Sequence, residues 1–114
     1  MLKLLKRCGV RVVRIQGDSM APALLSGDVG VFIQYRSRFL RPKRGHVALI
    51  DHPRLGMIVK RVTGFRENNE VDVRGDASTS TPAIDLGPLP ANRVWGRLLL
   101  RLNGQPKHSG SPAT

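Results

Sequence analysis

Ser19 is the first residue of this chain whose type and setting could support nucleophilic chemistry. It lies between two runs rich in β-branched residues, 10–15 and 29–33, in a segment where Gly17 and Gly27 permit tight turns. A hydroxyl at such a strand-to-turn junction can face a groove and attack a carbonyl once a base removes its proton. The same hydroxyl can instead cap the turn by accepting a backbone N–H. Ser19 is therefore a candidate nucleophile, with turn capping as the alternative.

Lys60 is the candidate base. If residues 56–62 form a strand, Ile58, Lys60 and Val62 point to one face of it. A lysine on an apolar face loses solvation, so its pKa falls, and a neutral lysine can act as general base for a serine. Lysine can also extend its ammonium out of an apolar face. The alternation of side chains along this strand thus favours Lys60 as a general base, but it also fits a lysine whose ammonium is in solvent.

Several short motifs occur in an order that resembles a known family. They are Gly17-Asp18-Ser19-Met20-Ala21-Pro22-Ala23-Leu24, Gly27-Asp28, Val59-Lys60-Arg61-Val62 and Gly75-Asp76. This order is similar to that of the signal peptidase I family of serine–lysine proteases. The short spacing and small size most resemble its compact branch, the nickel-type superoxide dismutase maturation proteases, over residues 12–101.

The resemblance implies a serine endopeptidase that removes an N-terminal propeptide from a precursor, a nickel superoxide dismutase. Ser19 would be the nucleophile and Lys60 the base, and the backbone N–H of Ser19 would hold the oxyanion. Gly17, Asp18 and Met20 would support that backbone and the turn. The resemblance implies no metal and no cofactor, and the three histidines and one cysteine show no metal-ligand spacing.

The chain departs from the family pattern at two places. Where the family has Gly-Asp-Asn, then a serine that hydrogen-bonds the lysine, then Asp-Ser-Arg, this chain has Ala77 in place of Asn and no Asp-Ser-Arg. Ser80 or Thr81 could supply the lysine-orienting hydroxyl, or both could simply be solvated. Many signal peptidases also add a hydroxyl two residues before the nucleophile, which Gly17 lacks.

Other functions stay open at this stage. Asp51 and His52 suggest a serine–histidine–aspartate triad, but adjacent strand residues point to opposite sides, and Ala21 breaks the G-x-S-x-G pattern. A signal peptidase I-like leader peptidase and a relative of the self-cleaving SOS-response repressors are alternatives within the serine–lysine class. A non-catalytic basic binding module is the third, suggested by the altered segment at Asp76-Ala77.

Charge and composition limit the classes of molecule that the chain is expected to bind. The chain has 114 residues, a formal charge of +11 and 4% aromatic residues. Binders of single-stranded nucleic acid combine basic groups with stacking aromatics, so we expect a protein substrate and no nucleic acid. The most basic segment, residues 35–45, is either a solvated face or a docking surface for an acidic substrate segment.

The domain organisation is expected to be simple. Residues 1–9 form a basic segment too short to span a bilayer, so we expect no transmembrane anchor and at most weak membrane-surface contact. Residues 10–102 form a single peptidase domain, and residues 103–114, rich in Gly, Pro and Ser, a disordered tail. A lone cysteine, Cys8, cannot form an internal disulfide, which fits a reducing, cytoplasmic location.

The elements that must position Ser19 and Lys60 are strands. Alternating and β-branched runs predict strands at residues 11–15, 29–33, 46–50, 56–62, 70–74 and 94–102, with a loop over 75–90. We therefore expect an all-β, mostly antiparallel fold with few or no helices, similar to the catalytic core of signal peptidases and SOS-repressor peptidases. Asp28 is expected to accept backbone N–H groups in the turn before its strand.

Overall fold

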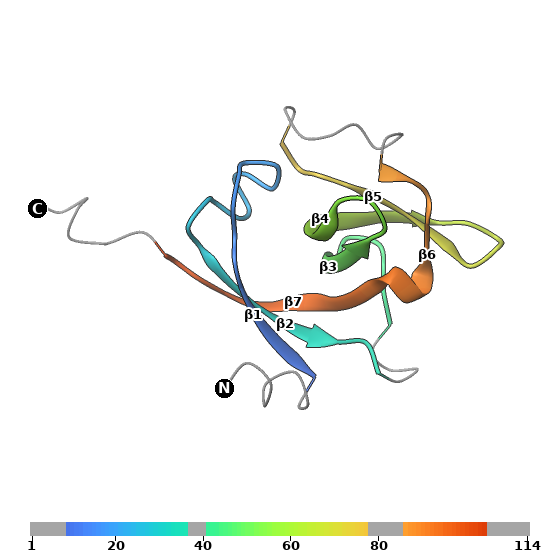
Figure 1. Cartoon of the computed structure of the whole chain (residues 1–114), viewed down its shortest axis with the longest axis horizontal. Helices are drawn as coiled ribbons and strands as arrows, with labels where there is room; N and C mark the ends of the chain where they lie inside the picture. Colours follow the sequence, from blue (N-terminus) through green and yellow to red (C-terminus); the bar gives the residue numbers. More distant parts are fainter. Residues whose placement is uncertain (1–8, 37–40, 78–85, 105–114) are drawn as a thin grey trace, which may run out of the picture.

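Seven strands form one antiparallel sheet, seen in the computed structural model, which describes residues 9–36, 41–77 and 86–104 (Figure 1). The strands are β1 (Val10–Arg14), β2 (Val29–Gln34), β3 (Val47–His52), β4 (Gly56–Phe65), β5 (Glu70–Arg74), β6 (Leu89–Pro90) and β7 (Val94–Leu102). A 3-10 turn, η1 (Ala91–Arg93), precedes β7. Their order across the sheet is β1-β2-β7-β3-β4-β5-β6, with every pairing antiparallel. The all-β, antiparallel prediction is confirmed.

Three predictions of where strands lie were wrong. Strand β3 continues past Ile50, because Asp51 and His52 still pair with Met57 and Gly56 of β4. Residues 89–90, expected in a loop, form β6, because Leu89 is buried and pairs with Val71 of β5. In both places the partner strand extends the ladder beyond the point where local turn residues suggest a stop. Strand β4 also continues past Val62, its predicted end, because Gly64 and Phe65 still pair with β5.

The buried side chains form two clusters. The larger one consists of aliphatic residues from β3 to β7 and the segment before β6: Ala48, Ile50, Val62, Val71, Val73, Leu86, Leu89 and Val94. The smaller one is Ile15, Met20 and Leu24, which pack against Val47, Val59 and Leu98. Since Met20 and Leu24 belong to the segment between β1 and β2, this second cluster fixes that segment onto the sheet.

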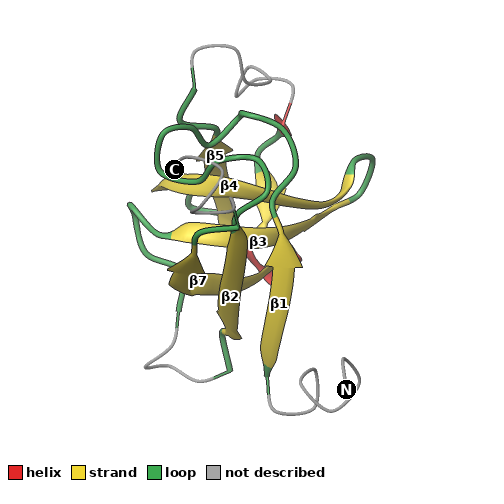
Figure 2. Cartoon of the chain, turned by 90° about the vertical axis from the view of Figure 1, so that its left-hand side faces the viewer, coloured by secondary structure: helices red, strands yellow, loops and turns green. Residues whose placement is uncertain are grey.

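The sheet is strongly twisted. Register shifts occur in the β2–β7 pair at Val31/Phe32 and in the β3–β7 pair at Leu49/Ile50, and such bulges increase the local twist. Figure 2 shows β1 and β2 running across the direction of β3 and β4. Strand β7 joins these two parts, because it pairs with β2 on one side and β3 on the other.

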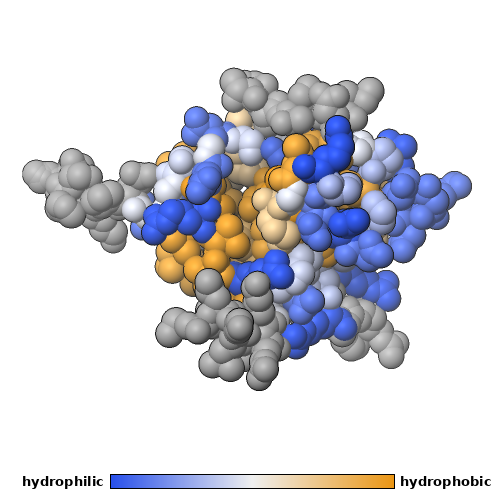
Figure 3. Space-filling view, in the orientation of Figure 1, coloured by the Kyte–Doolittle hydropathy of each residue, from blue (hydrophilic) through white to orange (hydrophobic). Residues whose placement is uncertain are grey.

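Part of the molecular surface is apolar. Exposed Val12 of β1 lies beside Val31 of β2, which in turn lies beside exposed Leu100 of β7. Figure 3 shows hydrophobic residues at the surface on the side of the molecule where these strands lie. Within the described ranges, no helix has the length and apolar character needed to cross a membrane.

Candidate active site

A cleft of about 360 Å³ brings Ser19 and Lys60 together. Its walls come from β1 with the residues that follow it, from the nucleophile segment (residues 16–28), from β3 and from β4. The lining residues are Val13, Arg14, Ile15, Gln16, Ser19, Met20, Leu49, Met57, Ile58, Val59 and Lys60. Of the residues expected to support the turn, Met20 lines the cleft, whereas Gly17 and Asp18 lie in the same turn without lining it.

Buried side chains and a backbone hydrogen bond hold the nucleophile segment in place. Met20 and Leu24 are buried, and the Leu24 N–H donates to the Met20 carbonyl at 2.9 Å. Gly17 has a φ of +81°, a conformation that strains any residue with a Cβ, so the glycine is needed for its backbone. Ser19 itself is half-buried at the cleft.

Hydrogen bonds orient both peptide groups that flank Ser19. The Asp18 carbonyl accepts from Ala21 N at 3.0 Å, and the Ser19 carbonyl accepts from Ala77 N at 2.8 Å. In a trans peptide the N–H points opposite to the C=O, so these bonds also fix the directions of the Ser19 and Met20 N–H groups. Among the described residues the Ser19 N–H donates to no backbone carbonyl. It is available for an oxyanion.

The Ser19 side chain has no hydrogen bond within the described part of the chain. The capping interpretation therefore finds no partner among those residues. Neither does a hydrogen bond join Ser19 Oγ to Lys60 Nζ in this structure. Catalytic hydrogen bonds commonly tighten only when substrate binds, so shared lining of one cleft is the relevant observation.

Lys60 is buried, with 6% of its surface exposed. It lies on β4 opposite Ala48 of β3, on the face that also carries Val62. No carboxylate among the described residues forms an ion pair with it. Burial without a counter-ion lowers the pKa of Lys60 from the ordinary lysine range, because desolvation disfavours the ammonium.

Two strand edges beside the cleft lack a neighbour in the described sheet. Strand β1 pairs with β2 alone, and residues 56–60 of β4 pair with β3 alone, since the β5 pairing begins at Arg61. Residues 13–16 and 57–60 are also the ones that line the cleft. Unpaired strand edges offer N–H and C=O groups to an added extended chain.

Asp51 and His52 do not form part of this site. Asp51 is exposed and pairs with Arg93 at 3.5 Å, whereas His52 is buried. The His52 Nδ1 accepts from Arg54 N at 3.1 Å and Leu55 N at 3.2 Å, so its Nε2 donates to the Leu86 carbonyl at 2.8 Å. The Nδ1 fixes the β3–β4 turn and the Nε2 binds the segment before β6, so neither ring nitrogen of His52 is left to act as a base for Ser19.

Asp28 has the structural role expected from the sequence. It is buried, and its Oδ2 accepts from Leu25 N at 2.9 Å while its Oδ1 accepts from Gly104 N at 3.3 Å. The Leu25 N–H bond is the main reason that the pKa of Asp28 is lowered, with Gly104 N and Arg101 adding to it. Asp28 thus closes the end of the nucleophile segment and also holds Gly104, a residue of the expected tail.

Several predicted features lie outside the described residues. These are Ser80 and Thr81, Cys8 with residues 1–8, and residues 105–114. The described part of the basic segment has exposed Arg41, Lys43 and Arg44. No group of three or more His, Cys, Asp or Glu side chains that could hold a metal ion occurs in the ranges that the structure describes.

Sequence reasoning missed two polar contacts. The Tyr35 hydroxyl donates to His46 Nδ1 at 2.7 Å, which must be an acceptor because Lys43 N also donates to it. Burial raises the pKa of Tyr35 to about 12 and lowers that of His46. Arg61 binds Asp76 through two hydrogen bonds. Arg61 and Asp76 both belong to motifs quoted for the resemblance, but nothing in the spacing of those motifs shows that the two side chains are in contact.

Comparison of the chain with protein-family models, with curated proteins and with solved structures gives no match.

Proposed function

We propose that this chain is a serine endopeptidase in which Ser19 is the nucleophile and Lys60 the general base. The observation that carries the proposal is the convergence of these two residues, from separate segments, on one cleft. The burial of Lys60 without a carboxylate partner among the described residues supports its role. A structural lysine would gain nothing from such a position, whereas a base must lose its proton.

The chemistry follows from these groups. Neutral Lys60 takes the proton of Ser19 Oγ as the oxygen attacks the scissile carbonyl. The Ser19 N–H, which donates to no backbone carbonyl in the described residues, stabilises the oxyanion that forms. Protonated Lys60 then gives its proton to the leaving amine, which departs and leaves an acyl-enzyme. Water, deprotonated by Lys60, hydrolyses the ester and frees Ser19.

The substrate would be an extended polypeptide. The unpaired edges of β1 and β4 flank the cleft, so a peptide bound between them could hydrogen-bond to both strands. The lining combines apolar side chains, such as Ile15 and Val59, with polar ones, and its apolar part suits apolar side chains near the scissile bond. A folded segment would not present its backbone in this way, so the cut belongs in a flexible region.

The resemblance to nickel-type superoxide dismutase maturation proteases suggests which polypeptide is the substrate. We propose that the substrate is a nickel superoxide dismutase precursor, whose N-terminal propeptide is removed in the cytoplasm. This activity requires no metal in the protease itself.

The test is cleavage of that precursor by the purified chain, with the new N-terminus identified by mass spectrometry. Ser19→Ala should abolish cleavage, and Ser26→Ala, in the same segment but outside the cleft lining, should leave it intact. Lys60→Arg should also be inactive, because guanidinium stays protonated and cannot accept the serine proton. Cleavage by a folded Ser19→Ala protein at the wild-type rate would rule out the proposed nucleophile.

A further inference from the structure

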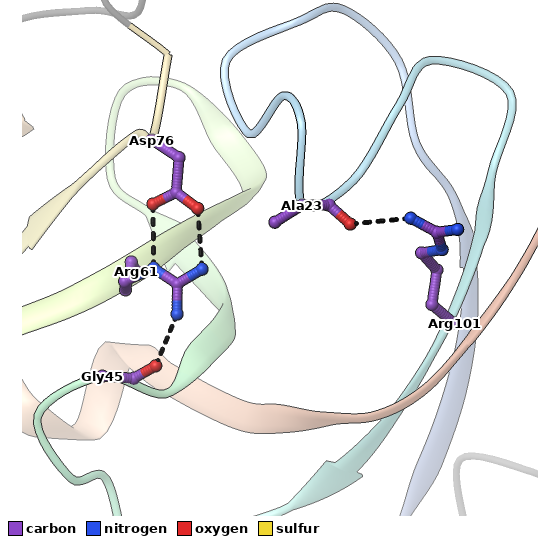
Figure 4. A network of polar contacts seen from close by, with 5 residues as sticks. All are labelled: Ala23, Gly45, Arg61, Asp76 and Arg101. Carbon is purple, nitrogen blue, oxygen red and sulfur yellow. Dashed lines mark hydrogen bonds and ion pairs between the residues drawn. The ribbon is translucent and has the colours of Figure 1, made fainter.

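Arg61, the residue after the candidate base, has a guanidinium fixed from two sides (Figure 4). Its Nε and Nη2 donate to Asp76 Oδ1 and Oδ2 at 2.8 and 2.7 Å, and its Nη1 donates to the Gly45 carbonyl at 2.8 Å. Paired N–H donors on a carboxylate are among the stronger and more directional contacts in proteins. The proposed chemistry uses neither side chain, and neither lines the cleft.

The ion pair leads to the nucleophile. Asp76 is followed directly by Ala77, whose N–H donates to the Ser19 carbonyl at 2.8 Å. A continuous series of contacts therefore links Lys60 to Ser19. Lys60 precedes Arg61 in the chain, and Arg61 forms an ion pair with Asp76. Asp76 precedes Ala77, whose N–H binds the Ser19 carbonyl. If β4 shifts, this series of contacts carries the nucleophile segment with it.

We propose that Arg61 and Asp76 are positioning residues that set Ser19 against Lys60, a role that rests on the proposed function. Their pair fixes the chain at Ala77 so that its N–H meets the Ser19 carbonyl. That bond fixes the Ser19–Met20 peptide and with it the direction of the Ser19 side chain.

The C-terminal half of the nucleophile segment is held by separate contacts with Arg101. Arg101 of β7 donates from Nη1 to the Ala23 carbonyl at 3.1 Å (Figure 4). Its Nε lies 3.7 Å from Asp28 Oδ2. Loss of the Arg61–Asp76 pair would leave these contacts and the buried Met20 and Leu24 in place. The expected result is a folded protein whose Ser19 is misplaced, and a displacement of about 1 Å can cost roughly 100-fold in rate.

The experiment measures kcat and KM for cleavage of the nickel superoxide dismutase precursor by Arg61→Gln and Asp76→Asn. Matched controls are Arg66→Gln and Asp72→Asn, which break a second arginine–aspartate pair, with Nε and Oδ1 3.2 Å apart, at the β4–β5 hairpin. Thermal unfolding of each variant identifies the temperature range in which it is folded. The two site variants should lower kcat about 10- to 100-fold with KM nearly unchanged, and the two controls should change neither.

Two further variants sharpen the outcome. Arg61→Lys keeps the charge and one possible hydrogen bond to Asp76, so it should recover part of the lost kcat. The double variant Arg61→Gln/Asp76→Asn should cost no more than either single change, because both break one contact. A kcat equal to wild type in folded Arg61→Gln and Asp76→Asn, with Ser19→Ala inactive, would overturn the positioning role alone. A raised KM at unchanged kcat would also overturn it, and absence of Ser19-dependent cleavage in the wild type would overturn the proposed function as well.

Discussion

Replacing Lys60 by methionine should make the protein inactive and more stable. Methionine is unbranched and close to lysine in length, so it can occupy the same path on β4 while removing the ammonium. Lys60 is 6% exposed, and the described residues give it no carboxylate partner. The wild type therefore bears the cost of removing much of the hydration of this ammonium without an ion pair from the described residues.

The size of the gain follows from that cost. A buried polar group without a hydrogen bond costs about 1–3 kcal/mol in mutational experiments. For a chain of this length, 1 kcal/mol shifts the unfolding temperature by roughly 4 °C. Because Lys60 still reaches the cleft, we expect the lower end of that cost, and Lys60→Met should raise Tm by roughly 4 °C at pH 7. Since the folded-state pKa of Lys60 is lowered, the unfolded chain binds more protons there between that lowered pKa and about 10.4, and wild-type stability rises with pH over this window. The advantage of the methionine variant should shrink accordingly as the pH is raised.

Differential scanning calorimetry of wild type and Lys60→Met between pH 6 and pH 10 would measure both effects. Lys43→Met is the matched control, because Lys43 is exposed and its loss should leave Tm nearly unchanged. A Tm that falls in Lys60→Met by as much as an ordinary core substitution would refute the reasoning. So would a stability difference that does not depend on pH, because Lys60 would then be a satisfied structural cation rather than a base.

Further predictions concern pH, the core of the sheet and the basic segment. The kcat/KM for precursor cleavage should rise with pH through the lowered pKa of Lys60, with a midpoint below about 10.4. Asp28→Asn should lower Tm at pH 7, and its difference from wild type should shrink as the pH falls below about 3.9, where the unfolded chain takes up the proton, and vanish below the lowered folded-state pKa of Asp28. Gly96→Ala should destabilise by about 1–3 kcal/mol in urea unfolding, because its Cβ would overlap the Ile33 carbonyl, whereas Gly64→Ala, with its nearest atom at 3.7 Å, should be tolerated. If the exposed cations of the basic segment dock an acidic substrate segment, added salt should raise KM, and this dependence should disappear when three residues are replaced by glutamine: Arg41, Lys43 and Arg44.

Local sequence pattern was sufficient to predict six of the seven strands, though not all of their ends. The β-branched runs of β1, β2 and β7 and the alternation in β5 lie within one residue of their predicted ends. The pattern failed at Asp51 and His52, at residues 63–65 and at Leu89, because pairing with a partner strand decides whether those residues are extended. Turn residues such as Pro53 mark where a strand could stop, and only the partner determines where it does.

The candidate site was predictable in its residue types but not in its connections. Ser19 could be selected from its turn, and Lys60 from the alternation that places it beside Val62. The bond between Ala77 N and the Ser19 carbonyl, and the pairing of Arg61 with Asp76, join segments far apart in the chain. Such contacts depend on how the sheet twists, and that twist comes from bulges with no clear local signal.

The position of β7 has a consequence for how the molecule is made. Synthesis completes β1, β2, β3 and β4 first, yet within the sheet the part that carries Ser19 is joined to the part that carries Lys60 only through β7. Until Val94–Leu102 has emerged from the ribosome and inserted between β2 and β3, the nascent chain has no backbone ladder linking nucleophile and base. Long-range pairings of this kind form late and slowly. If Ser19 and Lys60 act as proposed, the sheet that supports the two residues is complete only once the last strand of the chain has been synthesised.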